Sequence, residues 1–247
     1  MDWLSPVRDA ADRHRAPVAV FFRDDDGGWD DPALSALLEC FSATGVPVDV
    51  AVIPMACSAQ TREALGPHLA STGGIGRVHL HGYAHRNHES EGRRCEFGPS
   101  RDAYAVHREM EEGVGFMRTA FGADFDAVFT PPWNRCDARW LASMRAAGLD
   151  ALSRDATATP FGVAGMQELP IRVDWLRERG GRRLAMGAIG EWIADEIARG
   201  APTGVMLHHA KMQSKERSEL GRLLELVAAH PMLRPVHMGT LVRERNR

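Results

Sequence analysis

The stretch FFRDDDGGWDD, residues Phe21–Asp31, places three adjacent carboxylates, Asp24 to Asp26, at the end of an apolar run. The residues just before it, PVAVFF, are typical of a buried β-strand. A turn rich in aspartate and glycine is often simply solvated. Three like charges in a row repel one another, however, and a bound divalent cation would relieve that repulsion. The stretch therefore raises the question of whether this strand ends in a metal site.

The composition limits the classes of protein to which this chain can belong. Its 247 residues are 44% hydrophobic and 26% charged, which is ordinary for a globular protein, and single α/β barrels often have this length. A formal net charge of -3 gives no basic surface for nucleic acid. No segment approaches the ~20 apolar residues of a membrane span. We therefore expect neither a nucleic-acid partner nor a membrane partner.

The N-terminus and the cysteines indicate the compartment. Residues 1–22 carry acids early and contain only a short apolar run, which does not match a secretory signal peptide. The four cysteines are scattered and form no C-x-x-C pair. Without a secretory context we expect reduced thiols and a cytoplasmic protein.

Apolar strand-like runs alternate with helix-like periods along the chain, and this alternation predicts the fold class. Strands are expected at 18–22, 46–54, 77–82, 126–132, 149–155, 168–176 and 203–209, before a closing segment at 234–241. Helices are expected at 32–45, 101–120, 137–148, 189–200 and 214–230. Repeated β-α units imply a parallel sheet covered by helices. About seven strands without a dividing linker favour one α/β barrel domain over residues 1–247.

Four polar clusters follow directly after predicted strands. They are RDDDGG, HLHGYAHRNH, TPPWNR and LHHAK. In barrels the active site lies at the carboxyl ends of the strands. We therefore expect all four clusters to converge on one face of the molecule.

Histidines are concentrated in two of these clusters. His81 and His85 are four residues apart, so a helical turn after the strand would aim both imidazoles at one point. With one carboxylate they would form a set of two histidines and one acid, which leaves metal positions open for water and substrate. A single H-x-x-x-H pattern is common by chance. The interpretation as a metal site therefore depends also on the acids that are predicted to lie on the same face.

The order D-D-G, H-x-x-x-H, P-P-aromatic, L-H resembles the polysaccharide deacetylase superfamily, the NodB homology domain. The similarity spans about residues 18–243 and is specific in motif order and spacing. It implies a distorted (β/α) barrel, usually of seven strands. It also implies a metal-dependent hydrolase that removes acetyl or formyl groups from N-acylated sugars, or cleaves related non-peptide C–N bonds. We expect one divalent metal ion, zinc first with nickel, cobalt or manganese as alternatives, and a carbohydrate or other small N-acyl amine as substrate.

The resemblance implies roles for individual residues. Asp25 corresponds to the general base and Asp26 to a metal ligand. His81 and His85 correspond to the two metal histidines. His208 corresponds to the strand-end histidine that protonates the departing amine.

Other residues complete the expected site. His209 competes with its neighbour for the role of the acid. Pro132 and Trp133 match the proline and aromatic residue that line the substrate groove. Trp29, which follows the acidic run, is expected to form a wall of the pocket, because aromatic side chains commonly line ligand sites.

Three departures from the family pattern indicate a divergent branch. The usual Thr-Phe before the acidic pair is here Arg23-Asp24, and the Ser or Thr after the first metal histidine is Gly82. The arginine expected before Pro-Pro, which braces the base, is Thr130. Arg23 precedes the base by two residues, so both side chains point to the same side of an extended strand. We expect Arg23 to replace the missing arginine, with Arg135 as the second candidate.

Two other functions compete with this interpretation. His79 and His81 form an H-x-H pattern at a strand end, as in amidohydrolase-type barrels, although there it normally lies on the first strand. A non-catalytic domain that keeps the barrel, the metal and carbohydrate binding is the second rival, and the missing arginine supports it. The later aspartate and tryptophan of the family match either Asp155 or Asp174–Trp175. The sequence names neither the acyl group nor the amine.

Overall fold

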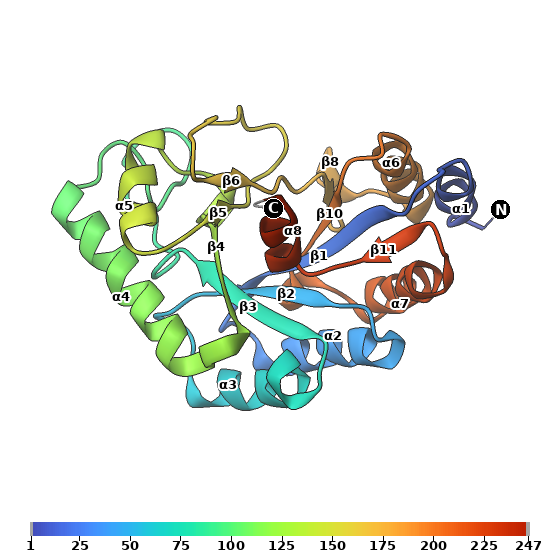
Figure 1. Ribbon diagram of the computed structural model, residues 1–247, viewed down its shortest axis with the longest axis horizontal. Helices are drawn as coiled ribbons and strands as arrows, with labels where there is room; N and C mark the ends of the chain where they lie inside the picture. The colour runs from blue at the N-terminus through green and yellow to red at the C-terminus, as the bar shows by residue number, and fades with distance from the viewer. Residues whose placement is uncertain (1, 246–247) are drawn as a thin grey trace.

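A parallel sheet forms the centre of the molecule, with helices packed around it (Figure 1). The computed structural model describes residues 2–245, and within them this sheet has nine strands. The strands are β1 Val18–Gly27, β2 Val48–Val52, β3 Gly76–His81, β4 Phe125–Thr130, β5 Ala151–Leu152, β6 Gln167–Glu168, β7 Val173–Asp174, β10 Thr203–Leu207 and β11 Leu233–Pro235. A separate antiparallel hairpin consists of β8 Glu178–Arg179 and β9 Arg182–Arg183.

The order of the strands shows how the barrel closes. Along the sheet the order is β6-β5-β4-β3-β2-β1-β10-β7, and β11 pairs with β1 beside this path. The two end strands, β6 and β7, belong to one extended segment, residues 167–174. Its first half pairs with β5 and its second half pairs with β10. One segment therefore joins both edges of the sheet, and the predicted (β/α) barrel is confirmed.

The strand predicted at 168–176 is divided into these two short strands. Pro170 lies at the division, and proline has no N–H to give to a ladder of hydrogen bonds. Leu169 donates its N–H to Leu152 on one side, and Arg172 donates to Gly204 on the other. If residues 167–174 are counted as one strand, the path around the barrel has seven strands, as predicted. Strand β11 is not part of this path, because it pairs only with β1.

Eight α-helices lie within the described residues. They are α1 Ser5–Asp12, α2 Asp31–Thr44, α3 Ala59–Leu65, α4 Ala103–Phe121, α5 Leu141–Ala146, α6 Met186–Ala198, α7 Ser214–Ala229 and α8 Met238–Arg245. All five predicted helices are present, although α5 is shorter than the predicted 137–148. The pattern did not predict α1 and α3. The closing segment 234–241 contains the end of β11 and the start of α8.

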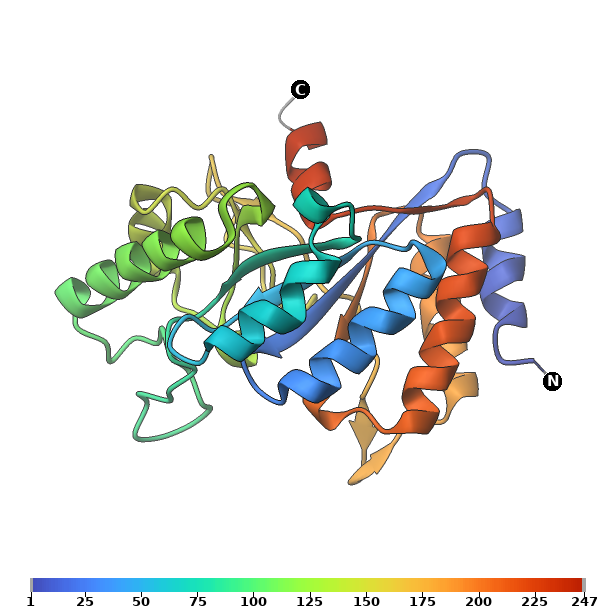
Figure 2. The same cartoon turned by 90° about the horizontal axis from the view of Figure 1, so that it is seen from below.

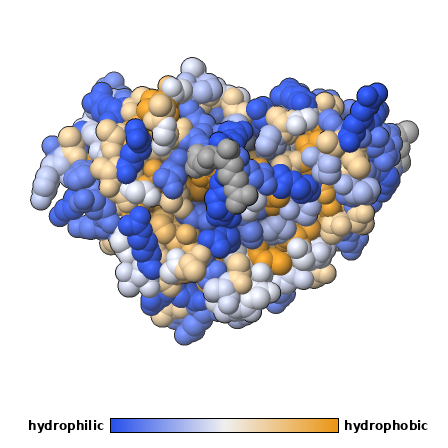
Figure 3. All heavy atoms as spheres, viewed as in Figure 1, coloured by the Kyte–Doolittle hydropathy of each residue, from blue (hydrophilic) through white to orange (hydrophobic). Residues whose placement is uncertain are grey.

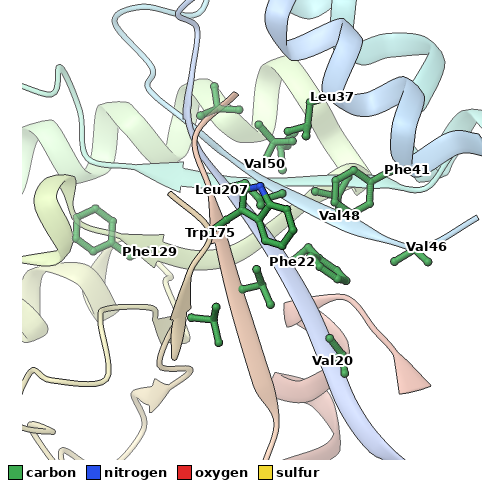
Figure 4. Packing of buried hydrophobic residues seen from close by; sticks show 14 of the residues in the cluster. Val20, Phe22, Leu37, Phe41, Val46, Val48, Val50, Phe129, Trp175 and Leu207 are labelled. Carbon is green, nitrogen blue, oxygen red and sulfur yellow. The ribbon is translucent and has the colours of Figure 1, made fainter. Parts of the chain in front are cut away.

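The central strand β1 is buried along its whole length. Val20 and Phe22 belong to the large outer cluster, in which the ring of Phe22 packs against Phe41 of α2 with ring centroids 5.4 Å apart (Figure 4). The alternate side chain of Phe21 points into the barrel and belongs to a smaller inner cluster. Each such fully buried apolar side chain contributes about 1.5–3 kcal/mol relative to exposure. This packing fixes β1 from both faces and so fixes the position of the acids at its end.

Helix α8 closes one end of the barrel. Figure 2 shows α8 at the end opposite to the one toward which β1 points. Its Met238 and Leu241 side chains are buried in the inner cluster. Asp49 of β2 accepts a hydrogen bond from the Met238 N–H at 2.9 Å. The carboxyl ends of the strands are therefore the open end of the barrel.

The surface around α8 is neither uniformly hydrophilic nor uniformly hydrophobic. Figure 3 shows hydrophilic and apolar residues interspersed over this face. None of the helices within residues 2–245 is long and apolar enough to cross a membrane. All four cysteines are free thiols in this structure.

Gly204 of β10 provides a test of the packing inside the barrel. A Cβ atom at this position would lie 2.4 Å from Cζ of Phe21. Gly204→Val should therefore lower the free energy of unfolding by about 1–3 kcal/mol through overpacking, as measured by chemical denaturation. The same change at Gly115, an exposed α4 position where a Cβ meets nothing within 4 Å, is the matched control. Equal effects at both positions would contradict the packing argument, and Phe21→Leu should partly rescue Gly204→Val.

Candidate active site

A bulge in β1 brings two adjacent acids to one cavity. Strand β1 extends through the acidic run and does not end at Phe22 as predicted. The pairing of β1 with β2 changes register between Asp24 and Gly27, and Asp26 has a left-handed backbone with φ of 71°. A regular strand would point Asp25 and Asp26 to opposite faces. The bulge re-aims one side chain, so that both carboxylates line the same cavity.

His81 and His85 meet Asp26 at this cavity. His81 is the last residue of β3, and Nε2 of each histidine lies 3.2 Å from Oδ1 of Asp26. The predicted helical turn between the histidines is not present. The chain instead turns through Gly82, with φ of 60°, and His85, with φ of 53°. The convergence of the two imidazoles is as predicted, but its local cause is left-handed backbone.

The donor set fits a divalent cation. Asp26, His81 and His85 each offer one ligand atom, and these atoms lie within 4.8 Å of one another. Nδ1 of His81 donates to the Thr130 carbonyl at 3.0 Å, which leaves the lone pair of a neutral imidazole on Nε2, facing the Asp26 carboxylate. Burial lowers the pKa of His81, but the hydrogen bond between a protonated Nε2 and Asp26 raises it overall, and a metal ion bound at this position would take the place of that proton.

The electrostatics keep Asp26 available as a ligand. Burial raises the pKa of Asp26, but its hydrogen bonds with His81 and His85 outweigh burial and hold the pKa well below its usual range. The carboxylate is therefore ionised at neutral pH. A set of one carboxylate and two imidazoles suits zinc and related divalent transition metals.

Glu96 replaces the hydroxyl residue that the family has after its first metal histidine. A Cβ on Gly82 would meet Glu96 and Pro132 at less than 3 Å, so serine or threonine would not fit at this position. The buried Glu96 carboxylate accepts backbone hydrogen bonds from Tyr83 at 3.2 Å and Ala84 at 2.7 Å. These bonds hold the turn that carries His85. This role could not be predicted from the sequence, because Glu96 lies within a charged stretch.

Arg23 forms a two-point ion pair with Asp25. Its Nε lies 2.7 Å from Oδ1 of Asp25, and its Nη2 lies 2.8 Å from Oδ2. Both side chains are buried, and the guanidinium has no exposed surface. Burial raises the pKa of Asp25, but the charges of Arg23, His81 and His208 hold it below its ordinary value. Asp25 is therefore an ionised, oriented acceptor beside the three candidate ligands.

Arg135, the second candidate for this role, lies elsewhere. Its guanidinium donates to the carbonyl of Arg94 at 3.2 Å. Thr130, at the position of the family's arginine, holds two histidines instead. Its carbonyl accepts from His81, and its hydroxyl hydrogen-bonds His79 at 2.9 Å.

The two histidines after β10 have different surroundings. His209 is buried, with Nδ1 2.6 Å from Oδ2 of Asp24 and Nε2 2.5 Å from the carbonyl of Trp29. Burial lowers the pKa of His209, but the Asp24 carboxylate raises it to about 9. His209 is thus an imidazolium that donates from both nitrogens. His208 lines the cavity, and its imidazole makes no hydrogen bond to any residue in the described part of the chain.

The cavity has a volume of about 300 Å³ and aromatic walls. Rings of Trp29 and Trp133 lie 4.7 and 4.5 Å from the His85 ring, so the two indoles flank this histidine. Seven predicted site residues line the cavity: Asp25, Asp26, Trp29, His81, His85, Trp133 and His208. Pro132 is buried against Gly82 and does not line it.

Three further residues, which were not predicted from the sequence, also line the cavity. They are Arg94, Asn134 and Lys211. Asn134 and Lys211 belong to the polar clusters TPPWNR and LHHAK, so their position after predicted strands was an available signal. Arg94 lies on a long loop and offered no such signal.

Of the two candidates for the family's later aspartate, Asp174 lies beside His208. Burial raises the pKa of Asp174, and the charges of His208 and Arg177 act against that effect. Asp155 instead accepts hydrogen bonds from the backbone and hydroxyl of Thr157, within its own turn.

Comparison with known proteins supports the fold. No protein-family model and no curated protein sequence matches the chain. A Mycobacterium smegmatis protein, provisionally described as a polysaccharide deacetylase, gives a TM-score of 0.71 at 13% identity, over 94% of this chain and 91% of that one. A family 4 carbohydrate esterase from Streptomyces lividans, in complex with acetate, gives 0.56 at 14% identity, over 91% and 95%. A Bacillus anthracis pseudoenzyme of that esterase family gives 0.53 at 12% identity, over 94% and 63%.

These structural neighbours define the class of fold. The chain has the fold of the polysaccharide deacetylase superfamily, as the order of its motifs predicted. At such low sequence identity the likeness establishes the fold alone. The activity has to be argued from the residues of the site.

The Asp24–His209 pair predicts a pH dependence of stability. The pKa of His209 is about 9 in the folded protein and ~6.5 for an unperturbed histidine. A raised pKa contributes stability that is complete below pH ~6.5 and is lost as the pH rises through about 9. His209→Gln should therefore cost on the order of 3 kcal/mol more at pH 6 than at pH 10. Urea denaturation at both pH values measures this difference, with His107→Gln on α4 as the control. A cost that does not change with pH would show that His209 is neutral.

Proposed function

We propose that this protein is a metal-dependent hydrolase that removes a small acyl group from an N-acyl amine, with an N-acetylated sugar as the leading substrate class. The observation that supports this function best is the content of one cavity. It holds an ionised carboxylate braced by arginine, three side chains that could ligate a metal, and a histidine whose imidazole has no hydrogen-bond partner among residues 2–245. These are the parts that hydrolysis of an amide requires.

Asp26, His81 and His85 would hold the metal ion. A divalent ion bound there supplies Lewis acidity, which polarises an amide carbonyl and lowers the pKa of water. The protein fixes the orientation of the ligands. The Thr130 carbonyl sets the tautomer of His81, and Glu96 holds the turn of His85.

Asp25 would accept the proton of the attacking water. Its pKa is lowered, so the carboxylate is ready as a base at neutral pH. Arg23 fixes both carboxylate oxygens and prevents rotation of the group. A positioned base of this kind contributes about 10²–10⁴-fold to the rate.

His208 would protonate the departing nitrogen when the C–N bond breaks. It lines the cavity together with Asp25, and no described residue takes up its nitrogens in a hydrogen bond. An imidazole in contact with the substrate can both hold and release a proton. His209 is unsuited to this step, because both its nitrogens already donate within the fold.

Trp29 and Trp133 would enclose the acyl group. Their rings flank His85, and the cavity of about 300 Å³ lies at the lower end of the ~300–1,000 Å³ typical of small-molecule sites. Walls of this kind exclude bulk water and orient the scissile bond. The size favours a short acyl group such as acetyl or formyl.

The two competing functions have less support in the geometry. The amidohydrolase-type alternative requires His79 as a ligand, but Nε2 of His79 bonds to Thr130, and the candidate ligand group among the described residues does not include His79. The non-catalytic alternative gains weight from the pseudoenzyme among the neighbours. Its main support was the missing arginine, and Arg23 supplies that charge from another position.

One experiment distinguishes the residues that bind the metal from those that transfer protons. His85→Ala should lower the bound metal at least ~10-fold, as measured by elemental analysis after dialysis. Asp25→Asn and His208→Ala should retain the metal and lose ~10²–10⁴-fold in acetate release from N-acetylated sugars. His88→Ala, an exposed histidine in the same loop, should keep both properties. Undiminished metal in His85→Ala would refute the ligand set, and an inactive wild-type protein with bound metal would favour the non-catalytic domain.

The replacement of the family's arginine by Arg23 is tested against Arg135. Arg23→Met leaves a buried carboxylate without its cation, so the pKa of Asp25 should rise and kcat/KM should fall most on the acidic side of the pH profile. Arg23→Lys keeps the charge without the two-point contact and should fall in between. Arg135→Met is the matched control and should stay near wild type. Circular dichroism checks that each variant is folded. An equal loss in Arg135→Met would show that Arg23 is not the replacement.

A further inference from the structure

A second cavity adjoins the proposed active site. It has a volume of about 380 Å³ and shares His208 and Lys211 with the site cavity. Its other walls come from the end of β7 and from the β8–β9 hairpin, which projects at the open end of the barrel (Figure 2). The two cavities therefore meet at the residue proposed to protonate the departing nitrogen.

The proposed chemistry indicates which part of the substrate would occupy this second cavity. If His208 gives its proton to the departing nitrogen, then the amine portion of the substrate lies on the His208 side. The acyl group lies between the metal ligands and the indole rings. The amine portion would extend past His208 into the adjoining cavity. This step rests on the proposed function.

Arg183, one of the cations in this cavity, is already committed to the fold. It lies 3.4 Å from Oε1 of Glu178, and it donates to the carbonyls of Leu176 and Lys211 at 3.3 Å. These contacts fasten the hairpin to the turn after β10. Its charge is thereby balanced by Glu178, which lines the same cavity.

Two other cations in the cavity are not committed. Lys211 and Arg177 are exposed, and neither side chain forms an ion pair or hydrogen bond with any residue that the structure describes. Asp174 is the remaining acid of the lining, and it accepts the backbone N–H of Leu176 at 3.0 Å. With Arg183 balanced by Glu178, Lys211 and Arg177 face only Asp174, whose charge interacts with Arg177, so the cavity keeps a positive excess next to His208.

We propose that the amine portion of the substrate carries an anionic group, a carboxylate or a phosphate, which Lys211 and Arg177 bind in the second cavity. Charge-assisted hydrogen bonds to such a group are stronger than those to a sugar hydroxyl. The anion would also position the leaving nitrogen against His208, because Lys211 borders both cavities. A neutral polymer chain would leave both cations without a partner.

The test compares substrates that differ in charge. The probes are N-acetylglucosamine, its 6-phosphate and N-acetylmuramic acid, which carries a carboxylate. The metal-loaded wild-type protein should prefer at least one anionic probe by about 10–100-fold in kcat/KM, the effect expected of one or two charged hydrogen bonds. Lys211→Met should reduce that preference by the same factor, and Arg177→Met should reduce it in part. Lys215→Met, the same change at an exposed lysine of α7, should leave it unchanged.

A binding measurement keeps this proposal separate from the proposed function. Calorimetry on the Asp25→Asn protein should show tighter binding of the phosphate or carboxylate probe than of N-acetylglucosamine, and Lys211→Met should remove the difference. A preference for either anion supports the proposal and identifies the group. Equal kcat/KM and equal binding for neutral and charged probes would overturn it while the hydrolase stands. Loss of the preference in Arg94→Met, but not in Lys211→Met, would also overturn it. Anion binding that depends on Lys211 without any turnover would support the anion site and refute the hydrolase.

Discussion

The guanidinium of Arg23 lies inside the barrel with no exposed surface, and the geometry of the site depends on it. Its five N–H donors match five oxygen acceptors, and its Nη2 also lies 3.2 Å from Sδ of Met206. Two of these oxygens lie on Asp25, one is Oδ1 of Asn134, and two are the carbonyl and hydroxyl oxygens of Ser153. A buried charge is tolerated only when it is paired and its remaining donors are satisfied. This one group thus fixes the Asp25 carboxylate and ties β1 to the residue after β5 and to the loop after β4.

The departures from the family pattern are linked through the same strand. Arg23 points into the barrel and holds Asp25, so the next side chain, Asp24, points outward to His209. His209 in turn holds the carbonyl of Trp29, a wall of the cavity. Thr130 orients His81 through its backbone carbonyl. Two of the departures from the family pattern, Arg23 and Asp24, are therefore adjacent side chains that act on opposite faces of β1.

The sequence predicted the barrel because its pattern is local. Apolar runs that alternate with helical periods identify strands and helices, and polar clusters after strands identify the open end. The order of motifs identified the superfamily fold. The inward direction of Arg23 also followed from the two-residue period of a strand. These features depend on spacing along the chain, which the sequence displays directly.

Features that depend on non-local contacts could not be predicted in the same way. The bulge that brings Asp25 and Asp26 to one cavity is a property of the pairing between β1 and β2. Glu96 acts across a turn whose path the sequence does not reveal. The division of the strand at 168–176 reflects two different neighbours, although Pro170 was a signal. The sequence could not show which of His208 and His209 faces the cavity, because this depends on the contact of His209 with the buried Asp24.

Left-handed backbone is concentrated at the mouth of the barrel. Among the described residues, the non-glycine positions with positive φ are Asp26, Asp30, His85, Trp133 and Asn134. Backbone of this kind opposes local preference by about 1–3 kcal/mol per residue. The strands beneath must hold these residues, because the loops alone would relax. A lineage that lost stability in its barrel would therefore lose the shape of the site before it lost the fold. Selection on the chemistry at one end of this molecule is thus also selection on the packing of the barrel beneath it.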